Sequence, residues 1–135
     1  MPASDRQVST EPFDKQLCCF VMARVLVVED SDTVRTMLCD AIQEAGHTAD
    51  CAVTQHEAEE LLSAGLYDLV ICTMVLADGS GLELAVKAAD LGMSTMVMSG
   101  HPGALKVTTI AGVTHLQQPY SAAEFRKLID AHLGA

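Results

Sequence analysis

Carboxylates and a hydroxyl follow two apolar runs of this sequence, where the side chains that act on ligands lie in a parallel sheet. Glu29 and Asp30 come directly after ARVLVV (23–28). Paired carboxylates are ligands that Mg²⁺ accepts. Thr73 follows the apolar run within DLVICTMVLADGSG (68–81). A threonine hydroxyl is a poor nucleophile without an adjacent base, so this strand delivers a group of little reactivity.

Two further polar side chains also follow predicted strands. Ser99 comes after the run Thr95–Met98, and Gln118 comes after Val113–Gln117. The carboxyl ends of parallel strands meet at one edge of a sheet, so we expect these side chains to lie near the acidic pair and the threonine.

Short β-branched runs alternate with helical patterns from residue 23 onward. Capping boxes at Thr54–Glu57 and Ser121–Glu124 mark the starts of two helices, and Gly46 ends an earlier one. The predicted strands are 23–28, about 48–53, 68–72, 95–98 and 113–117, and the predicted helices are 31–45, from 54, about 81–91, 102–111 and from 121.

Apolar spacing predicts the buried face of each helix. The β-branched run Val107–Ile110 disfavours a helix, so the one predicted at 102–111 is the weakest. The expected buried positions are Val34, Met37, Leu38, Ala41, Ile42 and Ala45 in the first helix, Ala58, Leu61 and Leu62 in the second, Leu82, Ala85, Val86 and Ala89 in the third, and Phe125, Leu128, Ile129 and Leu133 in the last.

Five consecutive strand–helix units predict an α/β fold with a parallel sheet between two helical layers, since crossover connections are right-handed. Ligands of such sheets bind beyond the carboxyl ends of the strands. The domain is expected to span residues 23–135, preceded by a functionally silent tail, residues 1–22, with a short helix from Phe13 to Phe20.

Four motifs in order resemble the receiver domains of bacterial two-component response regulators: VLVVED, DLVICTMVLADGSGLEL, VMSG and HLQQPYS. The resemblance covers about residues 23–133. It implies a flavodoxin-like doubly wound (βα)5 sandwich with strand order 2-1-3-4-5. The segment from Ser99 to His115 is a few residues short for the family's fourth helix.

The resemblance also implies a role for each site residue. Receivers accept a phosphoryl group on an aspartate of the third strand, with Mg²⁺ held by neighbouring carboxylates and a backbone carbonyl. Glu29 and Asp30 match the acidic pair, Ser99 the hydroxyl residue, and Val75 the carbonyl. Here, however, Thr73 stands where the phosphoacceptor aspartate belongs, and Gln118 where the lysine belongs. His115 stands at the aromatic switch position.

Losing both the aspartate and the lysine keeps the pocket's charge unchanged, and a threonine hydroxyl can hydrogen-bond a glutamine amide. We therefore expect a degenerate pocket in which Glu29 and Asp30 are at most weak Mg²⁺ ligands, with no metal or other cofactor required. The protein would not be an enzyme. It would be an atypical, stand-alone receiver of a phosphorelay, since no output segment follows Leu133.

The partners that the resemblance implies are a histidine kinase, a phosphotransfer protein or another receiver. A homodimer would use the face formed by the fourth helix, fifth strand and fifth helix. Two alternatives remain: a phosphotransfer-competent receiver with Asp30 or Asp78 as a surrogate acceptor, and a flavodoxin-like binder of small molecules. The acidic VEDSD after the first strand disfavours the latter, because it would repel phosphate.

Composition limits the other classes of function. A net charge of −10 with scattered basic residues argues against binding to nucleic acid. No apolar run reaches the roughly 18 residues of a membrane span, so we expect a cytoplasmic protein that does not bind membranes.

The five cysteines show no metal spacing. They are expected to be reduced thiols, with Cys39 and Cys72 on apolar faces. Redox sensing by Cys18 or Cys19 is the alternative.

Overall fold

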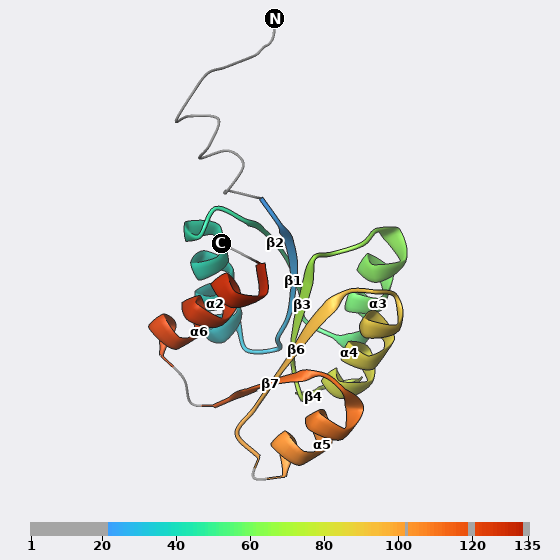
Figure 1. Cartoon of the computed structure of the whole chain (residues 1–135). Coiled ribbons are helices and arrows are strands. Elements are labelled where there is room, and N and C mark those ends of the chain that lie inside the picture. The colour runs from blue at the N-terminus through green and yellow to red at the C-terminus, as the bar shows by residue number, and fades with distance from the viewer. Residues whose placement is uncertain (1–21, 102, 119–120, 134–135) are drawn as a thin grey trace, which may run out of the picture.

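The computed structural model describes residues 22–101, 103–118 and 121–133. The predicted helix from Phe13 to Phe20, and Cys18 and Cys19, lie outside this part of the chain. Five parallel strands form one sheet in the order β2-β1-β3-β6-β7, which confirms the predicted order (Figure 1). These strands are β1 (Arg24–Val28), β2 (Thr48–Ala52), β3 (Leu69–Thr73), β6 (Ser94–Ser99) and β7 (Thr114–Gln117).

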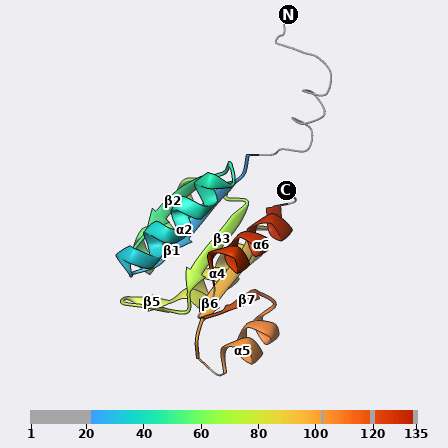
Figure 2. The same ribbon diagram turned by 90° about the vertical axis from the view of Figure 1, so that its left-hand side faces the viewer.

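Helices cover both faces of the sheet, with α2 and α6 on one face and α3, α4 and α5 on the other (Figures 1 and 2). The helices are α2 (Asp32–Glu44), α3 (Gln55–Ala64), α4 (Gly81–Asp90), α5 (Ala104–Ala111) and α6 (Ala122–Leu133). The α5 helix has only 8 residues, so the predicted short helix is confirmed. It ends at Gly112, whose φ of 78° is left-handed and suits glycine.

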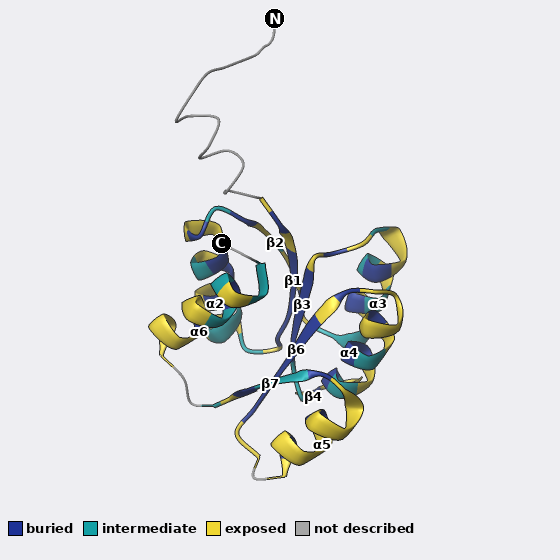
Figure 3. Cartoon of the chain, viewed as in Figure 1, coloured by how far each residue is buried: buried dark blue, intermediate teal, exposed yellow. Residues whose placement is uncertain are grey.

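The sheet separates two apolar clusters, which appear as the buried residues along the strands and inner helix faces (Figure 3). Strands β1 and β3 are buried on both faces, as their continuous apolar runs predict. On the α2 and α6 side, Ile42 meets Phe125 and Ile129 in one cluster. On the other side, Leu62 of α3 and Leu84 of α4 belong to the second cluster.

The caps agree closely with the sequence. The Ser121 backbone N–H donates to the Glu124 carboxylate at 2.8 Å, and the Ser121 hydroxyl accepts from the Glu124 N–H at 3.0 Å. The Thr54 hydroxyl likewise accepts from the Glu57 N–H at 3.1 Å. The Glu57 carboxylate accepts a hydrogen bond from the N–H of Val53, whereas the capping box would use the N–H of Thr54. Both predicted helix starts are therefore confirmed.

The predicted helix faces need two corrections. Met37 of α2 is 39% exposed, and Cys39 lies in the core in its place. In α4, Leu84 and Ala88 are buried, whereas the predicted Ala89 is exposed.

The structure joins Cys39 of α2 to Cys51 of β2 by a disulfide, with Cα atoms 7.5 Å apart. The prediction of reduced thiols was wrong for this pair, because sequence alone does not show that α2 packs over the edge strand β2. Cys72 is the free cysteine among the described residues, and it is fully buried. Burial raises the pKa of its thiol to about 12, which keeps it protonated and unreactive.

Within the described ranges, none of the helices combines the length and apolar character that crossing a membrane requires.

Candidate functional site

The predicted site residues lie at the ends of four adjacent strands, or directly after them, at the carboxyl edge of the sheet. Glu29 follows β1 next to β3, since Val28 pairs with Cys72. Thr73 is the last residue of β3 and pairs with Met98 of β6. Gln118 follows β7, where its N–H donates to the Ser99 carbonyl at 3.0 Å. The pairing thus brings these side chains to one edge in the order Glu29, Thr73, Ser99, Gln118.

A tight turn at the end of β1 holds the acidic pair. Glu29 is only 4% exposed, and its carboxylate accepts a hydrogen bond from the Ser31 N–H at 3.0 Å. Asp30 is exposed to solvent. Arg35 of α2 donates to the Glu29 carbonyl at 2.9 Å and pairs with Asp32. These hydrogen bonds to backbone groups hold the turn in place. The buried carboxylate of Glu29 therefore lies next to the exposed one of Asp30.

Burial raises the pKa of Glu29, and the hydrogen bond from the Ser31 N–H only partly opposes this shift. A carboxylate whose pKa is higher in the folded state destabilises the fold at pH values above that pKa, where burying its charge is costly.

We therefore expect Glu29→Gln to raise the melting temperature by a few degrees at pH 8. The gain should shrink as the pH falls through the folded pKa and vanish below the ordinary value of 4.5. Thermal unfolding followed by circular dichroism from pH 4 to pH 8 measures this. Glu60→Gln, at an exposed position of α3, is the control and should change little. A lower melting temperature for Glu29→Gln at pH 8 would contradict the conclusion that the buried charge of Glu29 destabilises the fold.

The donor set at this edge does not match a magnesium site. No group of three histidine, cysteine, aspartate or glutamate side chains that could hold a metal ion occurs among the described residues. Of the two adjacent carboxylates, one is buried and already hydrogen-bonded, and the neighbouring strand supplies Thr73. A hydroxyl offers Mg²⁺ no negative charge, so this edge lacks the third carboxylate that would favour the ion.

Thr73 is half-buried at the end of the central strand β3. Its backbone is held tightly, because the Met74 N–H donates to the Met98 carbonyl at 2.9 Å and the Gly81 N–H donates to the Met74 carbonyl at 2.8 Å. No hydrogen bond joins the Thr73 hydroxyl to the Gln118 amide, both of which the structure describes. The two residue types could form such a bond, but β6 lies between β3 and β7 and separates the ends of these two strands.

Ser99 and His115 are placed differently. The Ser99 hydroxyl accepts a hydrogen bond from the His101 N–H at 2.9 Å, and so stabilises the turn between β6 and α5. His115 lies in β7 opposite Val97. Its Nε2 atom is buried and finds no hydrogen-bond partner within the described residues. The Ser99 hydroxyl thus has a local structural role, and the role of His115 as a switch residue stays a prediction.

The segment after Thr73 forms a short hairpin where a loop was predicted. Strands β4 (Val75–Leu76) and β5 (Gly79–Ser80) pair antiparallel. The Asp78 carboxylate accepts hydrogen bonds from the N–H groups of Gln55 and His56, at 2.7 and 3.1 Å. The Gln55 side chain in turn accepts from the Ser80 N–H at 3.0 Å. The hairpin is therefore anchored to the start of α3.

Asp78 should stabilise the protein in a pH-dependent way. The two backbone N–H groups lower the pKa of its carboxyl below the ordinary value of 3.8. A lowered pKa in the folded state adds stability above the unfolded pKa, and this contribution is lost as the pH falls through the folded pKa.

Asp78→Asn should lower the melting temperature by a few degrees at pH 7, and by less as the pH falls below 3.8. Differential scanning calorimetry on both proteins gives the difference at each pH. Asp40→Asn changes an exposed carboxylate of α2 and is the matched control. An equal difference between wild type and Asp78→Asn at pH 7 and pH 2.5 would show that the charged form of Asp78 is not the stabilising one.

Two site residues were not predicted from the sequence. Arg35 lies 4 residues after the cap residue Ser31, where a side chain can reach back to the β1 end. Gln55 follows the cap residue Thr54, and nothing in its local sequence indicates contact with a loop 23 residues away. The position of Arg35 is a usable signal, whereas the contact of Gln55 depends on tertiary structure.

Comparison with known proteins gives one family. Residues 25–130 match the model of the response regulator receiver domain. The virulence transcriptional regulatory protein PhoP of Salmonella typhimurium is 34% identical over 84 residues, 61% of this chain and 38% of PhoP. The transcriptional regulatory protein DltR of Streptococcus agalactiae is 29% identical over 75 residues, 56% of this chain and 34% of DltR. The chain thus spans just over a third of these relatives.

Solved structures share the fold. The chemotaxis response regulator CheY4 of Vibrio cholerae superposes with a TM-score of 0.74 at 20% identity, covering 83% of this chain and 99% of CheY4. A two-component response regulator from Clostridium difficile gives 0.76 at 20% identity, covering 83% of this chain and 96% of that structure. At this identity the likeness concerns the arrangement of strands and helices alone.

Proposed function

Because this chain belongs to the response regulator receiver domain family of two-component signalling, we propose that it is an atypical receiver that acts without being phosphorylated. It acts by binding another protein, and this binding requires no covalent modification of the receiver. Receivers interact with histidine kinases and phosphotransfer proteins, and these, or another receiver, are the partners we propose. No catalytic activity of its own is part of this function.

Thr73 is the observation that carries the proposal. It lies at the end of the central strand, between the end of β1 and Ser99, where the family's acceptor is expected. Attack on phosphorus needs a nucleophilic oxygen, and a hydroxyl without an adjacent base is a weak one. Arg35, the cationic side chain at the acidic turn, is already engaged by Glu29 and Asp32. Electrophilic phosphorus would thus meet neither an acceptor carboxylate nor a compensating lysine.

A surrogate carboxylate is the competing explanation. Asp78 is poorly suited, because both of its oxygens already accept backbone N–H groups of α3. Asp30 is exposed and lies in the acidic turn, so it is the better surrogate.

Incubation with acetyl phosphate and Mg²⁺, followed by intact mass spectrometry, tests the function. We expect no added phosphoryl group on the wild-type protein. A base-labile phosphoryl group that disappears in Asp30→Asn or Asp78→Asn would instead support a surrogate acceptor. In parallel, proteins captured from a native lysate should be the same with and without acetyl phosphate. Capture that depends on the phosphodonor would contradict a phosphorylation-independent interaction.

A further inference from the structure

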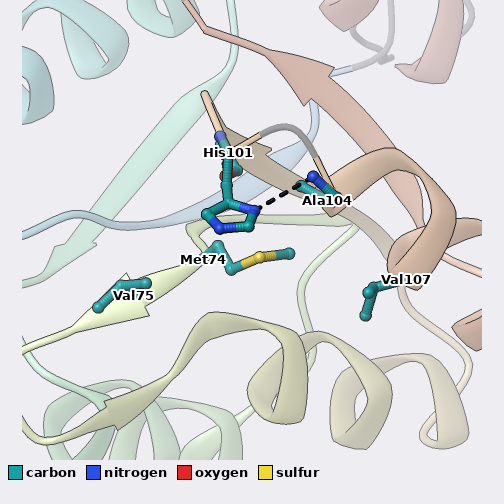
Figure 4. A pocket seen from close by; sticks show the side chains of 7 residues that line it. Met74, Val75, His101, Ala104 and Val107 are labelled. Carbon is teal, nitrogen blue, oxygen red and sulfur yellow. Dashed lines mark hydrogen bonds between the residues drawn. The ribbon is translucent and has the colours of Figure 1, made fainter.

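A pocket of about 270 Å³ lies between the β4–β5 hairpin and α5 (Figure 4). It is lined by Met74 and Val75 of the hairpin segment, by Ser99 at the end of β6 and His101 just after it, and by Ala104 and Val107 of α5. Its one hydroxyl, that of Ser99, is already bonded to the His101 N–H. The walls are otherwise mainly apolar side chains, so the pocket suits an aliphatic or aromatic group.

Exposed apolar side chains continue from this pocket along α5. Val75 is 75% exposed and Val107 is 44% exposed, although both line the pocket. Ile110 lies one helical turn beyond Val107 and is 78% exposed. A pocket with an adjoining exposed apolar strip is typical of a surface that binds another protein.

The charge of this region differs from that of the rest of the chain. All 18 acidic residues lie outside residues 91–123, which contain the whole of α5 and the pocket residues Ser99 and His101. The basic side chains of this stretch are Lys106, His101 and His115. Asp78, on the hairpin that forms the other wall, is directed to α3. In a chain of net charge −10, an acidic partner is repelled less by this stretch than by segments that carry carboxylates.

We propose that the pocket binds a large apolar side chain from an acidic segment of a partner protein. The apolar side chain would occupy the space above Met74, and flanking residues would cover Val107 and Ile110. Acidic side chains on either side would face Lys106. This inference rests on the proposed function, because it assigns the partner-binding surface of the same module and the chemistry of what binds there.

Methyl NMR with the full chain tests the inference. The probe is a capped synthetic peptide in which a phenylalanine–leucine pair is flanked by glutamates. Saturable binding should shift the Met74 methyl signal and leave Met37, on the opposite face of the sheet, unchanged. A peptide with serines in place of the apolar pair, and one with lysines in place of the glutamates, should bind at least about tenfold more weakly, which corresponds to about 1.4 kcal/mol.

Two variants with the same change of charge distinguish binding in the pocket from a general electrostatic effect on the peptide. Val107→Glu places a carboxylate at the pocket wall and should weaken peptide binding at least about tenfold. Leu105→Glu places one on α5 outside the lining residues, where the side chain is 60% exposed, and should weaken it much less. Equal effects of the two variants would contradict binding in the pocket.

Other outcomes overturn the inference directly. The absence of a saturable Met74 shift at millimolar peptide would do so, as would equal binding of the lysine peptide. A Met74 shift that grows with protein concentration alone would assign the pocket to a second copy of the chain. No phosphodonor is present in the titration, so its failure is distinguishable from failure of the proposed function, which is read from the intact mass.

Discussion

Gly81→Ala is expected to destabilise the protein by about 3 kcal/mol, lowering the melting temperature by about 10 °C. A Cβ atom at this position would lie 1.8 Å from the Thr73 carbonyl oxygen and 2.8 Å from its carbon. Both are backbone atoms of the central strand, so neither can move aside cheaply. Gly81 is buried, and its carbonyl also accepts a hydrogen bond from the Cys72 thiol at 3.2 Å. The start of α4 therefore requires glycine.

Gly103→Ala is the matched control. Its Cβ would meet His101 Nδ1 at 3.6 Å, an ordinary contact, and its φ of −88° is accessible to alanine. We expect a change within about 0.5 kcal/mol. Urea unfolding of the three proteins gives the comparison. Similar stabilities for Gly81→Ala and Gly103→Ala would show that α4 does not depend on close contact with the Thr73 carbonyl.

The double variant Thr73→Asp, Gln118→Lys is expected to gain phosphorylation that the wild type lacks. The aspartate supplies an acceptor oxygen and adds a third carboxylate beside Glu29 and Asp30, which favours Mg²⁺. The lysine supplies a cation for the developing charge on the phosphoryl oxygens. Acetyl phosphate with Mg²⁺ should then add one base-labile phosphoryl group, seen by intact mass.

Each single variant is a control for the pair. Thr73→Asp alone should be phosphorylated more slowly, because it lacks the lysine, and Gln118→Lys alone should not be phosphorylated at all. Melting curves must first show that the double variant folds. A folded double variant that takes up no phosphoryl group would mean that the pocket lacks more than these two side chains.

The sequence was sufficient to predict the topology and to predict which residues lie at the end of each strand. Continuous apolar runs such as 25–28 have few alternatives to a buried parallel strand, and the capping boxes at Thr54 and Ser121 act locally. Each of these signals involves only a few neighbouring residues, so a single sequence is enough to identify it.

Contacts between distant segments could not be predicted in this way. The Asp78 carboxylate bonds α3 across 23 and 22 residues of chain, and the hairpin that carries it looks like a loop in sequence. The Cys39–Cys51 bond depends on how α2 lies over β2.

The direct test of the central claim is to ask whether beryllofluoride, which mimics a phosphoryl group on a carboxylate, binds at Thr73. Fluorine NMR of the wild-type protein with beryllofluoride and Mg²⁺ should show only the signals of the free complexes. The Thr73→Asp, Gln118→Lys variant should show a bound signal in the same experiment. A bound signal in the wild type, placed at the end of β3 by a crystal structure with a metal ion beside it, would contradict the account.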